Sequence, residues 1–162
     1  MTLELKRLSL SQTNRPVDVF SYWVNEGYLE LNPPYQRGDV WGQIRQRNLI
    51  RSLMIGIPIP SIIVNDRFAA NWGEEIAIID GKQRITAILR FLDSELHVPA
   101  VWFGFAGSGD ISYKFLSLAQ QRRFRNIPMS VCEGRLESLG AEQEVFELVN
   151  FGGVPQGQSD NP

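Results

Sequence analysis

Cysteine and histidine are each present once, as Cys132 and His97, and these scarcities exclude several kinds of site. A single cysteine cannot form an internal disulfide, which favours a reducing, cytoplasmic setting. One histidine and one cysteine are too few for a zinc site of the His/Cys type. A Ser-His-Asp hydrolase would need His97, which lies between Leu96 and Val98 in a predicted strand, and we interpret this histidine as structural.

Long apolar runs and an excess of charge of one sign are also absent. The apolar runs are too short to cross a bilayer, and the first residues do not show the pattern of a secretory signal. The 16 basic and 18 acidic residues give a net charge of -2, so the chain as a whole has no general attraction for nucleic acid or an anionic membrane. Any basic binding site must therefore be local.

The residues that are present suffice for one folded domain. The 162 residues, of which 43% are hydrophobic, can bury a sizeable core. We predict a compact α/β (α+β) domain over residues 1–155 and a disordered tail at 156–162. Residues 14–16 are interpreted as the cap of the first helix. Strands are expected at residues 3–10, 28–31, 61–65, 76–79, 96–105 and 127–132, and helices at 16–27, 42–55, 85–92, 116–126 and 139–150.

The most informative stretch joins a strand to a helix. Residues 76–79 are almost wholly apolar, which is typical of a strand buried on both faces, and apolar residues then recur at helical spacing. A strand that enters a helix through a glycine leaves the first backbone amides unpaired, where the helix dipole favours an anion. Lys82 and Arg84 can add charge-assisted hydrogen bonds to a phosphate. The residues of this junction are Asp80-Gly81-Lys82-Gln83-Arg84.

Asp80 leaves the chemistry of the junction open. Its carboxylate could cap the helix, orient Arg84 through a salt bridge, hold a metal ion through water, or act as a base on a bound substrate. The sequence at this position does not distinguish among these four roles.

A second segment, residues 33–41, is stiff but not helical. Its two prolines exclude a helix and hold the backbone extended, so Tyr35, Gln36 and Arg37 could be presented to a ligand. In the alternative interpretation, Tyr35 and Trp41 fill the core while Arg37 pairs with Asp39.

Arginines gather on two of the predicted helices and could contact an anion. The first group is Arg45, Arg47 and Arg51, and the second is Arg122, Arg123 and Arg125. Both groups could bind DNA phosphates, although a solvated helix face is the commoner explanation for such charges. The two interpretations predict different salt dependence, because binding to phosphates weakens steeply as salt rises.

Four motifs, in this order, resemble the N-terminal domain of GmrSD-type modification-dependent restriction enzymes, and the resemblance extends from about residue 17 to residue 155. That family is similar in fold to the ParB N-terminal and sulfiredoxin group, which implies a small mixed sheet packed with helices. The motifs are Pro34-Tyr35-Gln36-Arg37 with Trp41, residues 49–60, Asp80-Gly81-Lys82-Gln83-Arg84, and residues 146–153, which end in Asn150-Phe151-Gly152-Gly153.

The resemblance implies a domain that binds a nucleoside triphosphate and, in several members, hydrolyses it. Lys82 stands where the family signature has a glutamine; an ammonium there could strengthen phosphate binding or disturb a hydrogen bond needed for hydrolysis. Magnesium is expected with the nucleotide, held mostly by phosphates and water, with Asp80, Asn150 and Glu147 as candidate ligands. Carried over by position, the catalytic residues would be Asp80, Gln83 and Arg84, and the nucleotide-binding residues would be Tyr35, Gln36, Arg37, Gly81, Lys82, Asn150, Gly152 and Gly153.

The chain departs from the family in its length. Restriction enzymes of this type continue into a helical region and often an HNH-type nuclease, for which one histidine is too few. The expectation is either a free-standing module that acts through a protein partner, in a phage or a defence locus, or a part of a longer protein. Two other functions stay open: a non-catalytic module that contacts DNA or senses its modification, and an interaction module that inhibits a restriction system.

Overall fold

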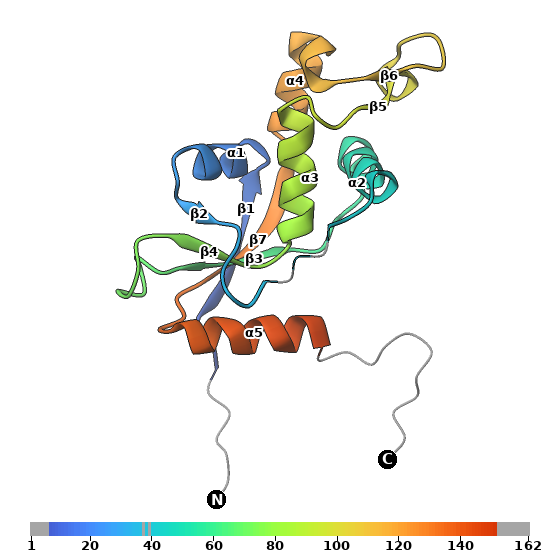
Figure 1. The fold of residues 1–162 in the computed structure, drawn as a ribbon. Helices are drawn as coiled ribbons and strands as arrows, with labels where there is room; N and C mark the ends of the chain where they lie inside the picture. The colour runs from blue at the N-terminus through green and yellow to red at the C-terminus, as the bar shows by residue number, and fades with distance from the viewer. Residues whose placement is uncertain (1–6, 37, 39, 152–162) are drawn as a thin grey trace, which may run out of the picture.

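The computed structural model describes residues 7–36, 38 and 40–151, the side chain of residue 151 excepted. Figure 1 shows a mixed sheet with helices on both of its faces. The strands are β1 (Leu10–Pro16), β2 (Leu29–Glu30), β3 (Ile62–Asp66), β4 (Ile76–Asp80), β5 (Val98–Pro99), β6 (Asp110–Ile111) and β7 (Pro128–Gly134). The helices are α1 (Asp18–Asn25), α2 (Gln43–Ile55), α3 (Lys82–Leu92), α4 (Leu118–Arg125) and α5 (Leu139–Phe151), with 3-10 turns η1 (Ala100–Phe103) and η2 (Tyr113–Phe115).

The main sheet has the order β1-β7-β3-β4-β2 and mixes parallel with antiparallel pairs. β3 runs antiparallel to β4 and parallel to β7, and β2 runs parallel to β4. Helices α1, α2 and α3 lie on one side of this sheet, and α5 lies across the other side (Figure 1). The mixed α/β architecture predicted for the chain is therefore confirmed.

β4 is buried on both faces, as its apolar run predicts. Ile78 belongs to the larger core, which also contains Phe20, Ile88 and Phe91, whereas its neighbour Ile79 belongs to a smaller cluster beneath α5. Successive side chains of a strand point to opposite faces, so each face of β4 requires its own cover. α3 covers one face and α5 covers the other, and the end of β4 lies between them.

The predicted first strand, residues 3–10, lies partly outside the described residues, and its described residues 7–9 form no strand; the prediction of the following cap is wrong. β1 begins at Leu10, and the residues interpreted as a helix cap, 14–16, are paired with β7. α1 begins only at Asp18. β1 is an edge strand that pairs with β7, more than a hundred positions later in the chain. Local periodicity in the sequence gives no information on such a distant pairing.

The strand predicted at residues 96–105 is also wrong over most of its length. β5 contains only Val98 and Pro99, and the chain then turns into η1, which ends at Gly104 with φ +83. β5 pairs only with β6, which also has two residues, so the β5–β6 pairing among the described residues ends after Pro99. Among the described residues, no helix is both long and apolar enough to cross a membrane.

Candidate functional site

The strand-to-helix junction is built around Gly81. This glycine has φ +100 and joins Asp80, the last residue of β4, to Lys82, the first residue of α3. The Ile85 amide donates to the Gly81 carbonyl at 3.0 Å, so the amides of the preceding helical residues have no acceptor within the helix. A Cβ at Gly81 would lie 2.4 Å from Ile62 Cδ1, so the chain passes too close to β3 for any larger residue.

A cleft of about 380 Å³ opens at this junction. Its walls come from the loop before α2, from the start of α3 and from α5. Most of the residues predicted for a nucleotide site meet here. The lining residues are Gln36, Trp41, Arg45, Asp80, Gly81, Lys82, Gln83, Arg84, Phe146 and Asn150.

Arg84 and Asp80 form a salt bridge at the base of the cleft. Arg84 Nη2 lies 2.6 Å from Asp80 Oδ2, and the arginine is 9% exposed. Of the four roles considered for Asp80, this salt bridge corresponds to the one in which the carboxylate orients Arg84. Arg84 Nε is buried and has no hydrogen-bond partner, and it lies against Gly81, 3.3 Å from where a Cβ would stand. A buried N-H without an acceptor is costly, so this atom is suited to a ligand oxygen.

Lys82 and Gln83 have different tasks at the start of α3. Lys82 Nζ donates to Asn32 Oδ1 at 2.6 Å, and the lysine also lines the cleft beside Arg84. Gln83 Oε1 accepts a hydrogen bond from the Trp41 backbone amide at 3.1 Å. Gln83 therefore attaches the loop before α2 to the start of α3.

Among the described residues before α2, Gln36 and Trp41 line the cleft and Tyr35 supports its wall. Gln36 Nε2 donates to the carbonyls of Ile78 and Ile79, at 3.0 and 2.9 Å, and lines the cleft. The Tyr35 hydroxyl lies 3.2 Å from Glu142 Oε2, and its ring packs on Phe146 with centroids 5.4 Å apart. Tyr35 is not a lining residue, so among the described residues it supports the wall made by α5 instead of facing the opening.

Three predicted site residues, Arg37, Gly152 and Gly153, lie outside the described residues. Asn150 is described: it lines the cleft near the end of α5, and its Nδ2 donates to the Phe146 carbonyl at 2.8 Å. Of the candidate magnesium ligands, Asp80 and Asn150 line the same cleft, whereas Glu147 is not among the lining residues. The described part of the chain contains no group of three or more His, Cys, Asp or Glu side chains that could hold a metal ion by itself.

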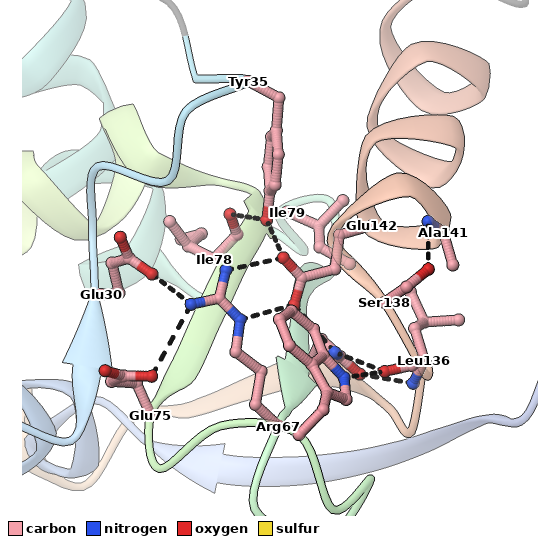
Figure 2. A network of polar contacts seen from close by, with 12 residues as sticks. Glu30, Tyr35, Arg67, Glu75, Ile78, Ile79, Leu136, Ser138, Ala141 and Glu142 are labelled. Atoms are coloured by element: carbon pink, nitrogen blue, oxygen red, sulfur yellow. Dashed lines mark hydrogen bonds and ion pairs between the residues drawn. The ribbon is translucent and has the colours of Figure 1, made fainter.

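A buried ion-pair network, which the sequence analysis missed, fixes α5 to the sheet. Arg67, just after β3, donates from Nε and Nη2 to the two carboxylate oxygens of Glu142, at 2.9 and 2.7 Å. Figure 2 shows Arg67 between this carboxylate and those of Glu30 and Glu75. Glu142 is 0% exposed, so its charge depends on this partner.

The network also sets the electrostatics around Tyr35. Burial raises the pKa of the Tyr35 hydroxyl well above its ordinary value, and the Glu142 carboxylate raises it further. Hydrogen bonds to Glu142 raise the pKa of Arg67 as well. One signal in the sequence could have revealed Glu142: it lies three and four residues before Val145 and Phe146, on the apolar face of the helix.

The arginines that were predicted to contact DNA phosphates lie on two separate helices, α2 and α4, and several of them already have partners within the protein. Arg47 forms a salt bridge to Asp110 at 2.5 Å, and Arg125 pairs with Asp18. Arg51 lies over the Trp102 ring, with its guanidinium carbon 5.8 Å from the ring centroid. The remaining members of the two groups are Arg45, which lines the cleft, and Arg122 and Arg123, which are exposed on α4.

The fold and the cleft together define a small α/β domain with a polar cleft at a strand-to-helix junction. The model of the GmrSD restriction endonuclease N-terminal domain matches residues 21–130, and the chain belongs to this family. Membership associates the protein with restriction systems. No curated protein and no solved structure matches the chain. The matched range contains the first three motifs of the resemblance and ends before α5, which carries the fourth.

Proposed function

We propose that the cleft binds a nucleoside triphosphate, as the nucleotide-binding part of a restriction or phage-defence system. The observation that carries this proposal is Arg84 Nε, which is buried against Gly81 without an acceptor. A phosphate oxygen at the start of α3 would satisfy this N-H and also accept from the first helical amides. Asp80 Oδ2 accepts from Nη2 of the same guanidinium, on the edge that also carries Nε, and so fixes the orientation of that edge.

The charge around the cleft supports a polyanionic ligand. Among the described lining residues, Arg45, Lys82 and Arg84 are cationic, and Asp80 is the acidic one. The whole chain carries a net charge of -2, so this local excess of positive charge is a property of the cleft and not of the protein surface in general. A triphosphate would neutralise these cations, and the surrounding protein would strengthen the attraction relative to water.

The residues present fit magnesium entering with the triphosphate. Magnesium is usually bound by one or two carboxylates together with substrate phosphates and water, and the cleft offers Asp80 and the Asn150 amide. When bound, the ion would neutralise phosphate charge and polarise a phosphoryl oxygen. Arg84 and Lys82 would orient the phosphates, which is most of what protein groups contribute to phosphoryl transfer.

Binding is more directly supported than hydrolysis. The Gln83 and Asp80 side chains each already accept a hydrogen bond, from the Trp41 amide and from Arg84 respectively. Hydrolysis would require a positioned water beside the terminal phosphate. Release of inorganic phosphate from ATP or GTP, compared between the native chain and Asp80→Asn, measures this second property separately from affinity.

Titration calorimetry with ATP and GTP in the presence of magnesium tests the proposal. Arg84→Lys keeps the charge but removes Nε, and Lys82→Ala removes a charge at the junction. We expect the affinity to fall by about tenfold or more for Arg84→Lys, because hydrogen bonds to charged groups contribute about 1.5–3 kcal/mol. Lys114→Ala, at an exposed position outside the cleft, is the matched control for Lys82→Ala and should leave the affinity unchanged.

The proposal fails if the native chain binds neither nucleotide, or if folded Arg84→Lys and Lys82→Ala variants bind as tightly as the native chain. The DNA-contacting alternative makes a different prediction, because it depends on the exposed arginines. A mobility shift of duplex DNA that weakens steeply with salt, and that Arg122→Ala with Arg123→Ala reduces, would favour it over a nucleotide site.

A further inference from the structure

Besides the junction residues, an aromatic and cationic pair lines the cleft. The Arg45 guanidinium carbon lies 4.6 Å from the centroid of the Trp41 ring, and both residues line the cleft. Trp41 is partly exposed and Arg45 is exposed. We refer to these two residues as the Trp41–Arg45 pair. An indole and a guanidinium both present flat surfaces of the kind on which nucleic-acid bases stack.

The backbone of Trp41 is held from two helices although the residue lies in a loop. Its amide donates to Gln83 Oε1 of α3 at 3.1 Å, and its carbonyl accepts from Gln46 Nε2 of α2 at 2.7 Å. Gln46 is 1% exposed, and Arg90 Nη1 donates to its Oε1 at 2.8 Å. A side chain whose backbone is fixed in this way loses little freedom when a ligand binds, which favours affinity.

We propose that the Trp41–Arg45 pair receives the base of the nucleotide, while the junction at 80–84 receives the phosphates. This inference rests on the proposed function and adds the part of the cleft that selects a nucleoside triphosphate over other polyanions. Every base has a flat face, so stacking tolerates all four bases. Purines have the larger ring system, so ATP and GTP should bind more tightly than CTP and UTP.

A second pair of the same composition provides an internal control. Arg51 lies over Trp102 with its guanidinium carbon 5.8 Å from the ring centroid, and neither residue lines the cleft. The two pairs have the same chemistry, and only the Trp41–Arg45 pair lines the cleft. Trp102→Ala and Arg51→Ala therefore measure how much the loss of such a pair outside the cleft changes the affinity for the ligand.

The test compares ATP with inorganic tripolyphosphate, each with magnesium, by titration calorimetry. Trp41→Ala should weaken ATP binding by about 5- to 150-fold, the range measured for removing an aromatic stacking partner. The same variant should bind tripolyphosphate as the native chain does, because tripolyphosphate has no base. Trp102→Ala should change neither affinity, and Arg84→Lys should weaken both.

Fluorescence gives an independent readout that does not depend on the alanine variant folding. ATP stacked on Trp41 should quench part of the tryptophan emission, whereas tripolyphosphate should not. Trp41→Phe keeps a stacking surface, so it should bind ATP within about threefold of the native affinity while losing the quenching. Arg45→Ala should weaken the binding of both ligands, because Arg45 is one of the cations of the cleft, and should weaken ATP binding more than tripolyphosphate binding.

The outcomes separate the two proposals. If neither ATP nor tripolyphosphate binds the native chain, the proposed function itself fails. If both bind with equal affinity, or if Trp41→Ala weakens both equally, the phosphate site stands and the base site is wrong. If Trp41→Ala does not fold, unquenched emission from the native chain at saturating ATP overturns the inference.

Discussion

Two features of position 81, its backbone conformation and the lack of space around it, each require a glycine. Its φ of +100 is a conformation that L side chains rarely adopt, and an added Cβ would meet Ile62 Cδ1 at 2.4 Å. The absent side chain also leaves room for the Arg84 guanidinium beside the start of α3. One residue therefore determines both how β4 enters α3 and where the buried Nε lies.

Gly81→Ala is expected to destabilise the protein by about 2–4 kcal/mol, from about 1–2 for the left-handed backbone and the rest from overpacking against Ile62. Gly107→Ala is the control, because Gly107 has a similar φ of +108 and open space around it, so only the backbone cost of about 1–2 kcal/mol applies. Urea unfolding of both variants measures the difference. Equal losses in the two variants would show that the approach of Ile62 to Gly81 is unimportant.

At the scale of the elements, α5 completes the cleft from the far side of the sheet. It supplies Phe146 and Asn150 to the lining and covers Ile79 of β4. Its attachment combines apolar packing with the buried pair of Glu142 and Arg67. A buried ion pair specifies one geometry strongly, because displacement leaves a charge without a partner. The pair therefore fixes where Asn150 lies relative to Asp80.

Glu142→Gln should destabilise the protein by about 3 kcal/mol, because Arg67 would lose its buried partner and keep only the two partly exposed carboxylates. The neutral side chain is nearly the same size, so packing changes little. Glu147→Gln, at an exposed position of the same helix, should cost no more than about 0.5 kcal/mol. Urea unfolding checks both values, and a loss of equal size in the two variants would contradict a structural role for the pair.

For the whole molecule, the charges near β4 form two separate groups. The cleft at the end of the strand gathers cations in a chain whose net charge is -2, whereas Arg67 sits among the carboxylates of Glu30, Glu75 and Glu142. Tyr35 lies at this acidic cluster, and its pKa is raised by burial and by Glu142. The stability of the fold should therefore depend on pH at the alkaline end.

The sign follows from the raised pKa. In the unfolded chain Tyr35 ionises near its ordinary pKa of about 10, whereas in the folded protein it stays neutral, so its contribution is complete below about pH 10 and declines as the pH rises further. Tyr35→Phe should lower stability by about 1 kcal/mol at pH 7, through the lost hydrogen bonds, and should reduce the further loss between pH 10 and 11. Urea midpoints from pH 7 to pH 11 test this. Tyr22 and Tyr113, whose pKa values are also raised, retain their contribution in both proteins. A variant with an undiminished alkaline loss would show that Tyr35 is not responsible.

The sequence by itself determined the strand-to-helix junction and the mixed α/β class. The apolar run of β4, the glycine and the change to helical spacing are local patterns, and each reports on the conformation of its own residues. For the same reason most helices were predicted within a few residues of their observed bounds, α2 and α5 among them. The range that the family model matches, residues 21–130, contains the motifs at residues 34–41 and 80–84.

Only the tertiary structure showed which distant parts of the chain come into contact. The register of β1 against β7, the pairing of Arg67 with Glu142 across 75 positions of sequence, and the hydrogen bond from the Trp41 amide to Gln83 all join distant parts of the chain. A carboxylate or an edge strand looks the same in sequence whether or not it has such a partner. The partner is chosen by burial, since a buried charge or an unpaired amide is stable only where the fold brings its complement within reach.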